Sequence, residues 1–179
     1  GAFAIVRVVY EMFGVEFAAT LGVLTPLAVL AAVTIVYGSL RALMQDELKK
    51  RLAYSTVRQV SYIVLGTALL GPVATTGALV HLVHQGLMKI TLFFSAGNYA
   101  ETLGVHHVSE MDGIGRRMPL TTAAFTVGAL GMIGVPPVAG FVSKLYLGAG
   151  AAQAGQWWAI GVLAVSSLLN AMYFLPVLH

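Results

Sequence analysis

A lysine beside a predicted helix break is the strongest chemical signal in the sequence. Lys144 is the only charged residue after position 117, and it follows the segment GVPPVAGF. Pro136 and Pro137 withhold backbone donors there, and Gly134 and Gly140 flank them. Inside a membrane, free backbone groups are tolerated where they are buried in protein or line water. The pattern predicts a transport site near mid-membrane; the alternative is that Lys144 extends from a proline kink to the membrane surface.

A second signal is a polar stripe in the segment HLVHQGLMK. His81, Gln85 and Lys89 are spaced i, i+4 and i+8, so they share one face of a helix. Imidazole and partly buried amines exchange protons near neutral pH, so such a stripe favours a water-linked proton relay. His84 lies about 60° away from this face. It could pair with His81 as a metal ligand, but no third ligand stands nearby, so we predict neither a metal nor a cofactor. The remaining alternative is that the stripe only joins helices by hydrogen bonds.

The third polar group is the segment DELKKR at positions 46–51. By hydropathy alone it is a solvated loop that fixes the orientation of the chain in the membrane. Near the end of the sequence, Ser166, Ser167 and Asn170 are expected to serve helix packing.

The composition places these groups in a membrane protein. Of the 179 residues, 58% are hydrophobic and only 9% are charged, against about 25% in soluble domains. The absence of cysteine excludes disulfides, thiolate zinc sites and iron–sulfur clusters. The net charge of +3 is small, and basic residues are not interleaved with aromatic ones, so no nucleic acid is expected as a partner.

Gaps between charges locate the membrane spans. Charged residues are absent from 17–40, 59–88, 118–143 and 145–179, and about 20 apolar residues cross a bilayer. We therefore predict helices over about 17–44, 54–71, 76–100, 118–152 and 156–179, with the fourth broken at Gly134–Pro137. The fold class is all-α membrane protein, with about five transmembrane helices plus a partial one over 1–16, in a single domain spanning 1–179.

Two polar connections, 45–55 and 101–118, should lie on the same side of the membrane. That side carries the basic residues Arg41, Lys49, Lys50, Arg51, Arg58, Arg116 and Arg117. Cytoplasmic loops carry an excess of Lys and Arg, so we predict both connections to be cytoplasmic.

Three segments in order resemble one known family. DELKKRLAYSTVRQ, HLVHQGLMKITLFFSAG and MIGVPPVAGFVSK are similar to the antiporter-like subunits of respiratory complex I, membrane-bound hydrogenases and Mrp-type sodium/proton antiporters. The last segment and the ending SSLLNAMYFLPVL most resemble the D-type Mrp subunit or its complex I counterpart. Members contain two inverted five-helix repeats, each with a broken helix and a key lysine. The resemblance implies that 17–179 is the second repeat of a longer protein, preceded by the end of a truncated helix over 1–16.

The resemblance also implies roles for single residues. Lys144 matches the broken-helix lysine, and Lys49 matches the first basic residue of the family's D-[IL]-K-R-x-L-A-Y-S motif. His81 and Lys89 match the ends of an H-x-x-x-H-x-x-x-K stripe, whose middle histidine is replaced here by Gln85. The proton path expected from these matches runs through Lys49, His81, His84, Gln85, Lys89 and Lys144.

The function predicted from the resemblance is one proton half-channel within a multisubunit cation/proton antiporter or an NADH-quinone oxidoreductase-type complex. The chain carries no catalytic residues of its own, and would count as part of an enzyme only as a subunit of such an oxidoreductase. Expected partners are other integral-membrane subunits, the lipid bilayer and protons, with sodium left open, in a bacterial inner membrane. The competing hypothesis is a membrane scaffold that transports nothing.

Overall fold

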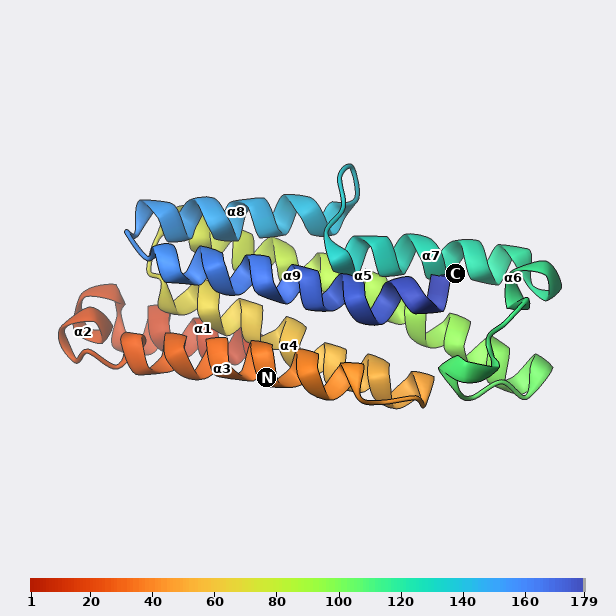
Figure 1. The fold of residues 1–179 in the computed structure, drawn as a ribbon. Helices are drawn as coiled ribbons and strands as arrows, with labels where there is room; N and C mark the ends of the chain where they lie inside the picture. Colours follow the sequence, from red (N-terminus) through yellow and green to blue (C-terminus); the bar gives the residue numbers. More distant parts are fainter. Residues whose placement is uncertain (179) are drawn as a thin grey trace.

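The computed structural model describes residues 1–178, with the backbone alone for Val15, and its regular elements are helical (Figure 1). In chain order they are α1 (Ala2–Arg7), a π-helical segment (Val8–Phe13), α2 (Val15–Thr20), α3 (Leu24–Leu43), α4 (Leu48–Ala68), α5 (Pro72–Leu103), a 3₁₀ turn (Val108–Glu110), α6 (Ile114–Arg117), α7 (Pro119–Ile133), α8 (Ala139–Gln153) and α9 (Trp157–Leu178). The predicted all-α membrane-type fold is confirmed.

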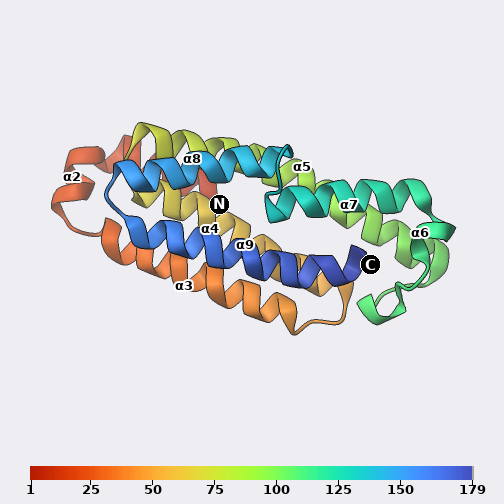
Figure 2. The same cartoon turned by 45° about the horizontal axis from the view of Figure 1, so that its top comes forward.

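The long helices lie side by side and connect at two opposite ends of the bundle (Figures 1 and 2). Within residues 1–178, three of them, α3, α5 and α9, are long and apolar enough to cross a membrane. The α5 helix has 32 residues, or about 48 Å of rise, which exceeds a bilayer core of about 30 Å. The shorter α7 and α8 follow one another along α5, so together they cover the length of one spanning helix.

The two polar connections meet at one end of the bundle. Residues Glu47 and His107 form an isolated antiparallel bridge between them. The amide of Leu48 donates to the carbonyl of His106, and the amide of Val108 donates to the carbonyl of Asp46. The turns before α5 and before α9 lie at the opposite end (Figure 1).

Two predicted boundaries were wrong. The span expected over 17–44 is divided, because α2 ends at Thr20 and α3 begins at Leu24. A continuous helix would press the ring of Pro26 against the carbonyl of Gly22, and Gly22 instead adopts a φ of 65°. The helix expected from about 54 begins at Leu48, so most of the predicted 45–55 connection is helical. The buried side chains of Leu48 and Leu52 explain this, because they extend the inward face of α4.

Small residues let α4, α5 and α8 approach closely. A Cβ atom added at Gly66 of α4 would lie 2.6 Å from a Leu147 methyl of α8, and one at Gly77 of α5 would lie 2.9 Å from the Leu147 amide nitrogen. Glycine at such positions is typical of helix packing in membranes, where backbones make close contact.

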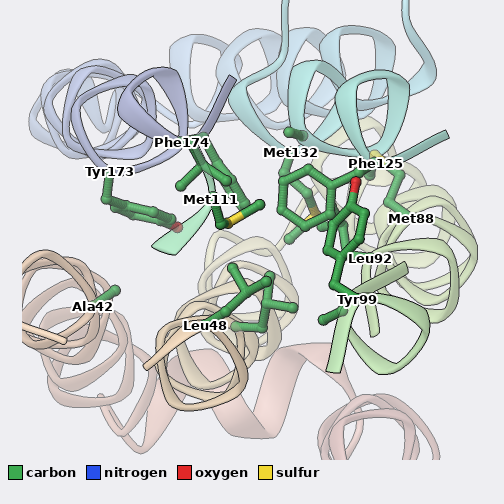
Figure 3. Packing of buried hydrophobic residues seen from close by; sticks show 14 of the residues in the cluster. Ala42, Leu48, Met88, Leu92, Tyr99, Met111, Phe125, Met132, Tyr173 and Phe174 are labelled. Carbon is green, nitrogen blue, oxygen red and sulfur yellow. The ribbon is translucent and has the colours of Figure 1, made fainter. Parts of the chain in front are cut away.

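Buried apolar side chains form two main clusters, one toward each end of the bundle. One cluster joins Leu48, Leu92, Phe125 and Phe174, from α4, α5, α7 and α9 (Figure 3). The other joins the opposite parts of α4, α5 and α9 with α3 and α8. Along each helix, the buried polar residues fall mainly between the two clusters: Ser55, Arg58, Gln59, His81, Gln85, Lys89, Ser143, Ser166 and Asn170. The bundle thus has a polar layer near its middle.

Outward faces of the helices are apolar. Leu30 of α3 is 64% exposed and Leu168 of α9 is 68% exposed. The exposed Trp157 and Trp158 begin α9 at one end of the bundle, where an interfacial aromatic anchor is expected. A polar middle and an apolar exterior suit a chain that is surrounded by lipid.

Candidate functional site

The helix break lies where the sequence predicted it. The α7 helix ends at Ile133, Gly134 turns left-handed with φ 87° and ψ 42°, and α8 begins at Ala139. Pro136 and Pro137 occupy the exposed turn between the two helices. The α7 and α8 helices are the two halves of the broken helix. A Cβ atom at Gly140 of α8 would overlap the carbonyl group of Gly131 of α7, so only a glycine fits at this contact.

The Lys144 side chain caps the C-terminal end of α7. Its ammonium group donates to the carbonyls of Met132 (3.1 Å) and Ile133 (2.6 Å), and to the hydroxyl of Ser167 on α9 (3.0 Å). The side-chain amide of Asn170 also donates to the Met132 carbonyl. Carbonyls at a helix C-terminus carry partial negative charge, which favours a cation. The lysine therefore turns toward the break, and not outward to the membrane surface.

His81 joins three helices at the polar layer. It is 1% exposed, and its Nε2 lies 2.7 Å from Gln59 Oε1 of α4 while its Nδ1 lies 2.9 Å from the Ser143 hydroxyl of α8. Ser143 directly precedes Lys144. Both ring nitrogens of His81 therefore face polar side chains of neighbouring helices. Its position links the polar stripe of α5 to the helix that carries Lys144.

Lys89 lies further along the same face of α5. It is 6% exposed and donates to the Leu52 carbonyl of α4 at 2.8 Å. Between Lys89 and His81 lies Gln85, whose Oε1 has no partner among residues 1–178. The neighbouring His84 is half-buried, and its Nδ1 likewise lacks a partner in the described part of the chain. The stripe therefore faces inward, but its members do not hydrogen-bond directly to one another.

Lys49 stands apart from these groups. It is exposed in the first turn of α4, ten residues and about 15 Å of helix rise before the Gln59 that contacts His81. The neighbouring Lys50 is also exposed, and pairs with Glu47 at 2.7 Å. The structure thus brings Lys144 and His81 into one region, places Lys89 further along the polar layer, and leaves Lys49 at the end of the bundle.

The ring of Tyr62 on α4 lies between Lys144 and His81. The Lys144 nitrogen lies 5.8 Å from the centre of its ring, and the His81 ring meets it edge-on at 5.2 Å between centroids. The Tyr62 hydroxyl donates to the hydroxyl of Ser166 on α9. Sequence reasoning missed this residue because a tyrosine within an apolar span reads as ordinary core. Its spacing from Arg58 and Gln59 on α4 was the only available signal.

Arg58 was named in the sequence analysis but misplaced. It was assigned to a polar connection, but it lies mid-helix in α4 with 0% exposure. Its guanidinium carbon is 5.7 Å from the Tyr62 ring centre and 5.6 Å from that of Tyr173 on α9. The Tyr173 hydroxyl in turn donates to Ser55 at 3.0 Å. The polar layer thus contains a cation between two tyrosines.

Acidic side chains fasten the two connections at the end of the bundle. The hydroxyl and the amide of Ser109 both donate to Asp46, and these bonds hold the pKa of Asp46 below its usual value. Glu110 accepts the amides of His106 and His107, which lower the pKa of its carboxyl group. We refer to the Asp46–Ser109 contact as the loop latch. It fixes the register of two loops that are far apart in sequence.

An open groove leads to the lysine from outside. It has a volume of about 410 Å³ and lies between α8 and α9, with Phe141, Ile160 and Leu163 among its apolar walls. Its polar lining residues are Lys144 and Ser167. Lys144 therefore lines a groove that opens on the outer face of the described chain.

Comparison with known proteins identifies close relatives. Residues 1–170 match the family described as "NADH:quinone oxidoreductase/Mrp antiporter, TM". NADH-quinone oxidoreductase subunit N of Desulforudis audaxviator is 46% identical over 179 residues, covering 99% of this chain and 35% of that protein. F(420)H(2) dehydrogenase subunit N of Methanosarcina mazei is 32% identical, covering 81% of this chain and 31% of that protein.

Solved structures agree with these matches. A chain of the Mrp complex from Dietzia sp. superimposes with a TM-score of 0.92 at 31% identity, covering 98% of this chain and 32% of that one. Respiratory complex I from Thermus thermophilus gives a TM-score of 0.87 at 26% identity, covering 99% of this chain and 37% of the matched one. The chain thus spans about a third of the length of the relatives it matches.

Proposed function

Because the chain belongs to the NADH:quinone oxidoreductase/Mrp antiporter membrane family, we propose that it provides one proton half-channel of a longer, proton-translocating subunit. The polar layer conducts the proton, and Lys144 binds and releases it at the helix break. The assignment of residues 17–179 to the second of two repeats belongs to the same proposal.

The observation that carries this proposal is the position of the Lys144 ammonium group. It bonds to two carbonyls freed by the break, and Tyr62 separates it from His81. Carbonyls at the end of α7 favour the charged amine, whereas its apolar surroundings favour the neutral one. Because the carbonyls and the apolar surroundings act in opposite directions, the amine can gain and lose a proton repeatedly. A cation with only a structural role does not require this balance.

The proton would reach Lys144 along the inward face of α5. Lys89 and His81 carry the proton, and water bridges the interval at Gln85, because an amide side chain does not itself titrate. The unpartnered Gln85 oxygen and His84 nitrogen, both in the described residues, are positions where such water would bind. Lys49 would act as the entry group from the cytoplasmic end, about 15 Å away from the polar layer.

Protons are favoured over sodium by the chemistry of the buried groups. Within residues 1–178, every Asp and Glu side chain is exposed or half-buried, and none lies in the polar layer. Sodium is a hard cation that oxygen ligands bind, carboxylates among them. A layer lined by amines, an imidazole and a guanidinium instead repels metal ions while allowing protons to pass between titrating groups.

The chain is an integral membrane protein, and its relatives come from multisubunit membrane complexes. We further propose that other membrane subunits flank it in a bacterial inner membrane, and that its polar connections face the cytoplasm. The excess of Lys and Arg at that end supports this orientation. The 46% identity to an NADH-quinone oxidoreductase subunit favours a redox-driven complex over a purely cation-driven one.

The test compares two lysine variants of the complete subunit, assembled in its native membranes. Lys144→Ala should reduce proton flux to background, measured as dye-reported acidification of membrane vesicles. Lys50→Ala is the matched control, because Lys50 is exposed and pairs with Glu47, three residues earlier at the start of α4. Recovery of the assembled complex must be similar for both variants. Normal flux in the Lys144 variant would refute the proposed function.

A further inference from the structure

Arg58 is the largest side chain in the described chain with almost no exposed surface. Only one of its terminal nitrogens, Nη1, donates a hydrogen bond, to the Ser166 carbonyl at 3.2 Å and more distantly to the Ser166 hydroxyl at 3.5 Å. Its Nε and Nη2 atoms have no partner within residues 1–178. The ring faces of Tyr62 and Tyr173 supply the remaining stabilisation as cation–π contacts.

This guanidinium group has no anionic partner among the described residues. A buried arginine is usually paired with a carboxylate, because an isolated buried charge is strongly disfavoured. The acidic side chains described here lie outside the polar layer. Aromatic rings and a carbonyl therefore stabilise the charge of Arg58 without neutralising it. The interior keeps a net positive charge at this point.

Along the axis of α4, Arg58 lies between the points where the two buried lysines contact this helix. Leu52, whose carbonyl accepts Lys89, precedes it by six residues, or about 9 Å of helix rise. Tyr62, whose ring contacts Lys144, follows it by one turn. Since both cations lie within 6 Å of the Tyr62 ring centre, Arg58 and Lys144 are at most about 12 Å apart.

All the helices packed around Arg58 contribute to its surroundings. The α3 helix presents Gly38, which has no charge, close to the Arg58 Cβ. The charged and titratable groups that face this region are Arg51 and Tyr62 on α4, His81 and Lys89 on α5, Lys144 on α8 and Tyr173 on α9. None of these groups is a carboxylate, so none supplies an anion to cancel the guanidinium charge.

A guanidinium group does not release its proton in proteins, so Arg58 is not a proton carrier. Its constant charge nevertheless repels a proton on a neighbouring amine. Two unit charges 12 Å apart, at an effective dielectric constant of about 20, alter the proton-binding equilibrium by about tenfold. Because Arg58 lies between the points where Lys89 and Lys144 contact α4, its charge repels a proton on either amine. It therefore favours proton release from whichever of the two lysines is charged.

We propose that Arg58 is a positioning residue for proton transfer, a permanent internal charge that promotes proton release from Lys144 and disfavours simultaneous charging of both buried lysines. This role rests on the proposed half-channel function. In addition, the positive charge that promotes proton release from Lys144 lies within the same repeat, on Arg58, which never carries the transported proton.

The test measures proton flux against pH for variants of the complete, assembled subunit. Arg58→Met removes the charge but keeps a long side chain, and replacing a buried charge by an apolar residue of similar volume often preserves folding. Arg58→Gln removes the charge but keeps polarity, and Arg58→Lys retains a cation. The Met and Gln variants should move the alkaline half-maximum of flux upward by about one pH unit, because the amine then holds its proton about tenfold more tightly. The Lys variant should move it by less.

Two results would overturn the inference. The first is reduced flux with an unchanged half-maximum in both neutral variants, which indicates a structural role. The second is an equal shift in Arg58→Lys and Arg58→Met, which indicates side-chain shape and not charge. The Lys144→Ala experiment separates this inference from the half-channel proposal. If that variant abolishes flux while the Arg58 variants leave the half-maximum unchanged, the half-channel stands and only the role of Arg58 fails.

Discussion

Gly134→Ala offers a way to displace the Lys144 ammonium without changing the lysine. Gly134 has a φ of 87°, and a Cβ atom added there would lie 2.9 Å from Lys144 Cδ and 3.1 Å from its Nζ. The matched control is Gly104→Ala at the C-terminal end of α5, where φ is 66° and a Cβ atom would meet nothing within 4 Å. Both variants place alanine in the left-handed region, at a cost of about 1–2 kcal/mol. Only Gly134→Ala also crowds the lysine.

The difference between the two variants isolates the lysine contacts. If the ammonium loses one of its carbonyl partners, Gly134→Ala should be less stable than Gly104→Ala by about 1.5–3 kcal/mol, the usual range for a hydrogen bond to a charged group. Thermal unfolding of the purified complete subunit measures this difference, and vesicle acidification measures flux. We expect flux to fall in Gly134→Ala and to persist in Gly104→Ala. Equal stability and equal flux would refute the reasoning that the break and Lys144 act as one unit.

Three further expectations concern packing and the loop latch. Gly77→Val should destabilise the complete subunit by about 1–3 kcal/mol, because the new side chain meets the backbone of Leu147; unchanged thermal unfolding would contradict the close α5–α8 contact. Asp46→Ala should speed amide exchange at Ser109, which loses its acceptor, and equal exchange would show that the latch does not form. The depressed pKa of Asp46 means that the latch is fully present above about pH 4 and is lost as pH falls through the folded-state value, so exchange at Ser109, corrected for intrinsic rates, should not change between pH 5 and 8.

Features with a strong local signal could be predicted from the sequence. Charge gaps identified the membrane class, and the prolines near Gly134 located the break, because backbone chemistry at such positions acts within a few residues. The spacing of His81, Gln85 and Lys89 predicted an inward polar face for α5, where the structure places all three. Each of these predictions depends on neighbours in the sequence.

Features that depend on packing between distant helices could not be predicted. Arg58 resembled a loop cation because its neighbours in sequence are polar, and only the positions of Ser166 and Tyr173, more than 100 residues later, give it a buried environment. Tyr62 was overlooked for the same reason. The start of α4 was also placed too late, because hydropathy reads LKKR as solvated although Leu48 faces the core.

The most direct test of the central claim is proton flux in Lys144→Arg, compared with Lys50→Arg in the same complete subunit. Arginine keeps the positive charge and the donors that the Met132 and Ile133 carbonyls accept, but it does not release a proton. If Lys144 carries the transported proton, Lys144→Arg should assemble normally and show only background flux, while Lys50→Arg matches the unmodified subunit. Unchanged flux in Lys144→Arg would contradict the claim, because it would mean that a fixed charge at this position is sufficient.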